Sequence, residues 1–130
     1  MNILLDTCTF LWLIADSPEL SGPAREVFAD PENEVYLSVA SCWEIVVKWS
    51  MGRLALPEEP GRFLPRQRHQ HEIEPLALVE EATWHLPKLP LLHKDPFDRI
   101  LICQAIEHSL ILLTPDPLIT QYPVRTLWPS

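Results

Sequence analysis

Glycine is scarce in this sequence: the 130-residue chain contains three, and they do not form a glycine-rich loop. Such loops cradle the phosphates of bound nucleotides, so a P-loop is excluded. No serine stands in a Gly-x-Ser-x-Gly setting, which excludes the serine nucleophile typical of α/β-hydrolases. Any catalysis by this chain must therefore use other residue types.

Cysteine and long apolar runs are also limited. The three cysteines are widely spaced and form no Cys-x-x-Cys pair, which favours reduced, packed thiols over disulfides or a zinc site. The apolar runs are shorter than the ~20 residues that a membrane span needs. Residues 1–6 lack a basic region followed by a long apolar stretch, so we expect no signal peptide and a cytoplasmic protein.

Positive charge is the third shortage. Lysine and arginine together number 10 against 18 aspartates and glutamates, which gives a net charge of −8. Nucleic acids normally bind to a basic surface, so the charge alone argues against such a partner. A bound divalent cation would weaken this objection, because it neutralises nearby carboxylates and attracts phosphate itself.

What the sequence does contain is an alternation of short apolar segments with helical patterns. Apolar residues make up 47% of the chain, enough for the core of one domain. We expect strands at residues 2–5, 34–37, 73–76, 110–114 and 124–127, and helices at 9–15, 24–29, 39–51, 62–71, 79–86 and about 95–106. Continuously apolar strands between helices predict an α/β fold whose parallel sheet is covered on both faces.

The clearest helix begins after residue 38. Its apolar residues recur at the i, i+3, i+4, i+7, i+8 spacing of one helix face: Val39, Cys42, Trp43, Val46 and Val47. We therefore predict that this face packs into the core, and that Gly52 ends the helix.

Acidic residues stand close to the ends of the predicted strands. Asp6 follows the first strand, and Asp116 follows the fourth by two residues. Asp98 lies in the first turn of the helix that leads into the fourth strand. Glu44 lies within about 10 Å of the start of its helix, at ~1.5 Å per residue. Because ligands bind beyond the carboxyl ends of parallel strands, we predict that these four acids meet at one edge of the sheet.

Such a cluster implies a cation. Two like unit charges ~4 Å apart repel by about 4 kcal/mol at an effective dielectric constant near 20, so carboxylates gather only where something positive neutralises them. Oxygen ligands without a convergent histidine or cysteine favour Mg²⁺, with Mn²⁺ as a substitute, over zinc.

Each acid also has a structural explanation of its own. Asp6 could cap the helix that follows it. Glu44 fits a capping box with Ser41 and an i, i+4 ion pair with Lys48. Asp95, which precedes a proline, is typical of an N-cap, and an acid three residues later suits the helix dipole.

Four segments resemble, in order, the motifs of PIN-domain proteins, and in particular VapC-type toxins of bacterial toxin–antitoxin pairs. They are LLDT at residues 4–7, LSVASCWEI at 37–45, HKDPFDRILICQA at 93–105 and LLTPD at 112–116. Lys48 and the GRL of residues 52–54 continue the second motif. The D-P-F-D-R block with W-E-I upstream is the most specific part of this resemblance.

The resemblance implies a three-layer α/β/α sandwich with a mostly parallel central sheet of four to five strands. It also implies a Mg²⁺-dependent endoribonuclease that a cognate antitoxin holds inactive, commonly as a homodimer. By position in the motifs, Asp6, Glu44 and Asp98 become metal ligands. Asp116 becomes the fourth acid, often acting through water, with Thr114 nearby.

Further residues follow from the same motifs. Asp95 belongs to the D-P-F-D block. Prolines on both sides of Asp116 remove two backbone donors and stiffen its loop, a departure from the family pattern. The RNA contacts that we predict are basic residues near the motifs: Lys48, Arg53, Lys94 and Arg99. By analogy with the family, residues 62–71 and the leucine-rich residues 11–20 would hold the antitoxin.

Two other functions remain open at this point. A Mg²⁺-dependent phosphatase or phosphoacceptor domain also carries aspartates at strand ends. The phosphatase usually has Asp-x-Asp where this chain has Asp6-Thr7-Cys8, and the phosphoacceptor has no equivalent of Glu44. The other alternative is a non-catalytic PIN-like binding module, against which the four retained acids argue.

Overall fold

The computed structural model describes residues 1–92 and 95–129. In these ranges five strands alternate with helices: β1 (Asn2–Leu5), β2 (Glu34–Ser38), β3 (Ile73–Leu76), β4 (Ile111–Leu113) and β5 (Thr126–Leu127). The helices are α1 (Thr7–Ile14), α2 (Gly22–Ala29), α3 (Val39–Ser50), α4 (Pro60–Gln70), α5 (Glu80–Thr83) and α6 (Pro96–Glu107), with short 3₁₀ turns η1 (Leu86–Lys88) and η2 (Ile119–Gln121). None of the helices described is both long and apolar enough to cross a membrane.

The sheet has the strand order β3-β2-β1-β4-β5, and every pairing is parallel. The chain moves outward from β1 to β2 and β3, and β4 then adds on the opposite side of β1. The gap between the carboxyl ends of β1 and β4 is therefore a topological switch point, the usual ligand position in open parallel sheets.

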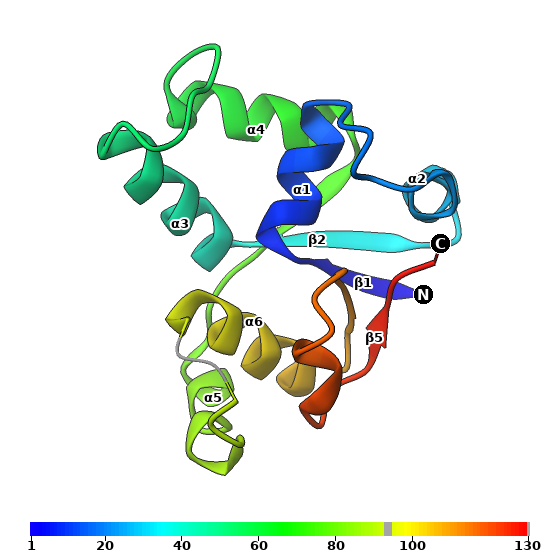
Figure 1. Ribbon diagram of the computed structural model, residues 1–130, viewed down its shortest axis with the longest axis vertical. Helices are drawn as coiled ribbons and strands as arrows, with labels where there is room; N and C mark the ends of the chain where they lie inside the picture. The colour runs from blue at the N-terminus through cyan, green and yellow to red at the C-terminus, as the bar shows by residue number, and fades with distance from the viewer. Residues whose placement is uncertain (93–94, 130) are drawn as a thin grey trace.

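Alternate residues of the central strand enter two different cores. Ile3 and Leu5 pack into a cluster with Phe10 of α1 and Ile45 of α3, whereas Leu4 packs into a second cluster with residues of α6. Ile3, Leu4 and Leu5 of β1 are fully buried. Figure 1 shows the corresponding layers, with α1 to α4 on one side of the sheet and α5 and α6 on the other. The predicted three-layer α/β/α fold is confirmed.

The predicted buried face of α3 was wrong at Val39 and Trp43, which are 48% and 64% exposed. Cys42 of the same stripe packs against the core, but the buried residues of the helix are Ala40, Ser41, Glu44 and Ile45. Helical periodicity finds an apolar stripe but does not say what it faces. The buried Ser41 accepts a hydrogen bond from the hydroxyl of Thr7.

The ends of the helices follow local signals in most cases. Gly52 adopts φ +71°, a conformation that favours glycine, directly after the turn that closes α3. Asp95 caps α6, since its carboxylate accepts from the backbone N–H groups of Phe97 and Asp98. The helix expected at 79–86 is only α5 followed by η1, because Pro87 interrupts the backbone hydrogen bonding.

Candidate functional site

A cavity of about 220 Å³ opens at the carboxyl ends of β1 and β4. Its lining joins the four acids singled out in the sequence with neighbours from α1 and α3: Asp6, Thr7, Cys8, Leu11, Glu44, Lys48, Asp98 and Asp116. We call this space the carboxylate cavity. It lies at the switch point of the sheet, where a ligand is expected. The structure brings the four acids together, while their roles as metal ligands and catalytic residues stay a prediction.

Asp6 is held between the two strands that form the switch point. Its backbone N–H donates to the carbonyl of Leu113 over 3.1 Å, and its Oδ2 accepts from the hydroxyl of Thr114 over 2.5 Å. Asp6 does occupy the N-cap position of α1, as the alternative reading predicted, but its side chain makes no cap hydrogen bond there. Burial raises the pKa of Asp6, and the Thr114 hydroxyl opposes that rise.

Glu44 reaches the cavity from α3. That helix is capped by Ser38, whose Oγ accepts from the backbone N–H of Ala40, so the alternative capping box of Ser41 with Glu44 is not needed to start it. Glu44 is 6% exposed. Its Oε2 accepts a hydrogen bond of 2.6 Å from Nζ of Lys48, which confirms the predicted i, i+4 ion pair. This hydrogen bond raises the pKa of Lys48.

Asp98 enters from the first turn of α6. Burial raises the pKa of its carboxyl group to about 7, and the negative charges of Asp95, Asp6, Glu44 and Asp116 add to that rise in this order. Asp95 itself is the exposed cap of α6 and does not line the cavity. Its negative charge acts on the Asp98 carboxyl group, and its carboxylate also accepts from the backbone N–H of Asp98.

Asp116 is positioned by the loop after β4. Its backbone N–H donates to Oγ1 of Thr114 over 3.1 Å, and its Oδ1 accepts from the backbone N–H of Leu118 over 2.9 Å. The flanking prolines take no part in these bonds. Thr114 therefore links two acids of the cavity, because it accepts from Asp116 and donates to Asp6.

The chemistry of these donors fits a hard divalent cation. The four acids provide oxygen ligands, and no histidine is among the described residues that line the cavity. Burial and the charge of Asp6 raise the pKa of the Cys8 thiol to about 12, so it remains protonated and is a poor ligand. Among the described residues, no three His, Cys, Asp or Glu side chains already stand as a ligand group.

The basic residues predicted to contact RNA do not all lie at the carboxylate cavity. Lys48 lines the carboxylate cavity. Arg53 is exposed beyond the end of α3. Arg99 points elsewhere, with its guanidinium bonded to the carbonyl of Pro90 and the hydroxyl of Tyr122. Lys94 lies outside the described residues.

Sequence reasoning missed three lining residues from α1: Thr7, Cys8 and Leu11. Thr7 and Cys8 directly follow Asp6, and Leu11 lies one helical turn after them. A helix that starts immediately after a site residue presents its first turn to the same space, so this spacing was a usable signal.

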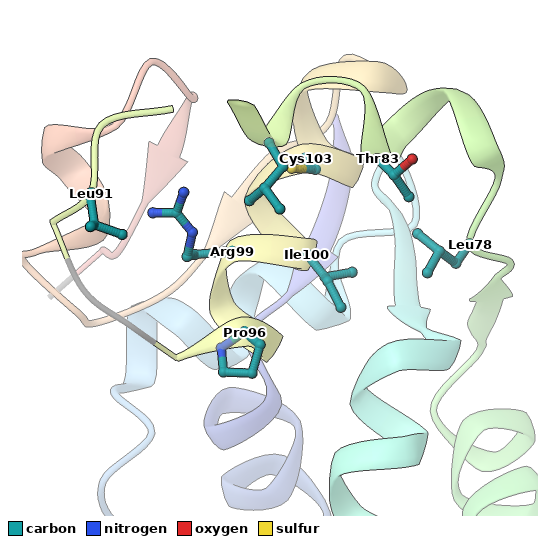
Figure 2. Close-up of a pocket in the computed structure, with 8 residues that line it drawn as sticks. Leu78, Thr83, Leu91, Pro96, Arg99, Ile100 and Cys103 are labelled. Atoms are coloured by element: carbon teal, nitrogen blue, oxygen red, sulfur yellow. The ribbon is translucent and has the colours of Figure 1, made fainter. Parts of the chain in front are cut away.

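A second cavity, of about 360 Å³, lies between α5 and α6. Figure 2 shows that Leu78 and Ile100 face it and that the Arg99 guanidinium lies towards Leu91. Pro96, Ile100 and Cys103 line it from one face of α6, whereas Asp98 lines the carboxylate cavity from another. The residues described in its lining include no acid, in contrast to the four acids of the carboxylate cavity.

A model of the PIN domain family matches residues 3–124, and the chain belongs to this family. Among curated proteins, it is 31% identical over 61 residues to Ribonuclease VapC16 of Mycobacterium tuberculosis strain ATCC 25618 / H37Rv. That match covers 47% of this chain and 43% of the relative, so the chain matches less than half of the relative's length.

Solved structures share the fold over nearly the whole chain. The VapBC2 crystal structure from Rickettsia felis, bound to a DNA fragment from their promoter, has a TM-score of 0.75 at 16% identity and 98% coverage of both chains. A toxin–antitoxin complex from Klebsiella pneumoniae has a TM-score of 0.54 at 18% identity, covering 88% of this chain and 86% of that one. At these identities the similarity establishes the fold alone.

Proposed function

We propose that this protein is a Mg²⁺-dependent endoribonuclease, the toxin of a toxin–antitoxin pair, which hydrolyses RNA phosphodiesters with metal-activated water. The observation that carries the proposal is the meeting of four carboxylates from four separate segments in the carboxylate cavity. Membership of the PIN domain family and sequence similarity to a protein named as a ribonuclease support it.

In this proposal Asp6, Glu44 and Asp98 hold the cation, and Asp116 acts as the fourth acid. The ion supplies a bound water of lowered pKa and a positive centre for the leaving oxygen. Thr114 fixes one oxygen of Asp6 through its hydrogen bond and so orients the carboxylate. The cation also answers the objection from the net charge of −8, because it offers phosphate a local positive charge.

An antitoxin is the proposed partner. The solved toxin–antitoxin complex with this fold supports it. So does an apolar cavity of about 360 Å³ between α1 and the α3–α4 connection, which includes part of the predicted residues 11–20 and, from residues 62–71, Phe63. Leu11 lines both this cavity and the carboxylate cavity, so a segment bound here would lie beside the acids.

We also propose a homodimer. Exposed apolar side chains surround the cavity of Figure 2, among them Leu78, Leu86 and Leu91, and a second copy would cover them. Sedimentation of the purified protein tests this. A Leu91→Glu variant is expected to shift the protein towards monomer, whereas a wild type that is monomeric at high concentration contradicts the proposal.

The nuclease is tested with purified, partner-free protein and a panel of structured RNAs. With Mg²⁺ or Mn²⁺ we expect cutting that EDTA abolishes. Asp6→Asn and Asp98→Asn should each reduce it more than about a hundredfold, because even residues behind metal ligands are worth 10- to 100-fold. Glu81→Gln, on α5 and outside the cavity lining, is the control. Cutting that survives EDTA and both substitutions would overturn the proposal.

A further inference from the structure

The carboxylate cavity contains one basic side chain among its described lining residues, and that is Lys48. Its Nζ lies 2.6 Å from Oε2 of Glu44. The contact follows from helix geometry, since residues four apart on α3 lie on the same side of the helix, one turn from each other. The ammonium group therefore occupies space next to one of the proposed metal ligands.

The two partners differ sharply in their access to water. The side chain of Glu44 is 9% exposed and that of Lys48 is 48% exposed. A buried carboxylate that loses its positive partner is strongly destabilising, so a nearby cation stabilises Glu44. Lys48 can move into solvent at little cost, because its ammonium is well hydrated and its four-carbon stem is flexible.

A divalent cation bound to Glu44 would lie next to the ammonium group of Lys48. That ammonium already takes a lone-pair site of Oε2, and two cations a few ångströms apart repel each other. Each cation therefore weakens the binding of the other to Glu44.

We propose that Lys48 is an internal competitor for the divalent cation: it neutralises Glu44 when the cavity holds no ion, and its charge opposes the binding of an ion there until the ammonium moves away. This rests on the proposed function of the carboxylate cavity as a cation site. The lysine then raises the free cation concentration at which the cavity fills. After its release it stands at the rim, beside the position where the substrate phosphate would approach the ion.

The experiment measures Mn²⁺ affinity by calorimetric titration and by the electron paramagnetic resonance signal of free Mn²⁺. Lys48→Met keeps the length of the stem and removes the charge, whereas Lys48→Arg keeps a charge. Lys88→Met removes a charge at the end of η1, outside the cavity lining, and is the matched control. We expect Lys48→Met to bind Mn²⁺ about tenfold more tightly than wild type, and the other two variants to stay within about twofold of wild type or bind more weakly.

Thermal unfolding gives a second readout. Without cation, Lys48→Met should melt at a lower temperature than wild type, because Glu44 loses its partner. Saturating Mn²⁺ should remove that difference. A lysine that only stabilises the helix would give the first effect without the gain in Mn²⁺ affinity.

Two failures are distinguishable. Unchanged or weaker Mn²⁺ binding by Lys48→Met, or tighter binding by Lys48→Arg, overturns the role of Lys48 while leaving the cation site intact. Mn²⁺ binding that is absent from wild type and Lys48→Met, or that is insensitive to Asp98→Asn, overturns the cation site and this inference with it.

Discussion

The hydroxyl of Thr114 donates a 2.5 Å hydrogen bond to Oδ2 of Asp6, although the two residues lie 108 positions apart in the chain. Thr114 is 2% exposed and directly follows β4, just as Asp6 directly follows β1. The bond spans the switch point of the sheet. It commits one oxygen of Asp6 to the protein and leaves the orientation of the carboxylate fixed towards the cavity.

Thr114→Val tests the value of that bond. The substitution keeps the side chain's shape but removes the hydroxyl. We expect nuclease activity to fall about 10- to 100-fold while the protein stays folded. Thr9→Val is the matched control, because the buried Thr9 hydroxyl donates to the carbonyl of Leu113 and not to an acid. Equal activity losses in both variants would show a general effect of packing instead.

Asp98 gives a prediction for stability against pH. Its pKa lies at about 7 in the folded protein and at 3.8 ordinarily. Between these values the folded state holds more protons than the unfolded chain, so the free energy of unfolding falls as pH rises through this window. In EDTA, Asp98→Asn should therefore melt above wild type at pH near 8 and approach it as pH falls to about 4.

Melting temperatures over that range, with Glu81→Gln as the control acid, check this prediction. Saturating Mg²⁺ should reverse the order at pH near 8, because wild type gains a ligand for the ion and the variant does not. Wild type as stable as Asp98→Asn in EDTA at this pH would contradict charge repulsion in the cavity.

The Cys8 thiol should react slowly with alkylating reagents, although Cys8 lines the carboxylate cavity. Burial and the charge of Asp6 raise its pKa from 9.0 to about 12, so the reactive thiolate becomes about a thousandfold rarer. Timed alkylation near pH 8, followed by mass spectrometry, should label Cys8 slowly in the folded protein and quickly after denaturation. Cys8→Ser should keep nuclease activity within about threefold, and a complete loss would point to a covalent role.

Trp43 and Ile45 are neighbours on α3 with opposite surroundings. Trp43 is 64% exposed and Ile45 is fully buried. Trp43→Ala should therefore cost less than about 1 kcal/mol of the free energy of unfolding, while Ile45→Ala should cost about 2–5 kcal/mol. Denaturant titration measures both. A cost above about 2 kcal/mol for Trp43→Ala would mean that this face is covered in solution.

Local sequence patterns predicted the strands and most helices, because these elements depend on residues that are close together in the chain. The apolar run of Ile3, Leu4 and Leu5 is continuous since both faces of β1 are buried, and this is visible without coordinates. The cap at Asp95 and the pair of Glu44 with Lys48 depend on residues within one helical turn. Motif resemblance then selected the acids that the structure brings into one cavity.

The remaining features depend on contacts between distant segments. The position of β4 decided that the Asp6 carboxylate bonds to Thr114. The packing of α6 decided which cavity Arg99 faces. The periodicity of α3 wrongly predicted that Val39 and Trp43 are buried, because an apolar stripe has the same spacing whether it meets the core or a partner. By itself, the sequence determined the elements, the parallel α/β class and the set of candidate acids. Only the tertiary structure decided which side chains meet, because burial and long-range hydrogen bonds arise when separate segments pack together.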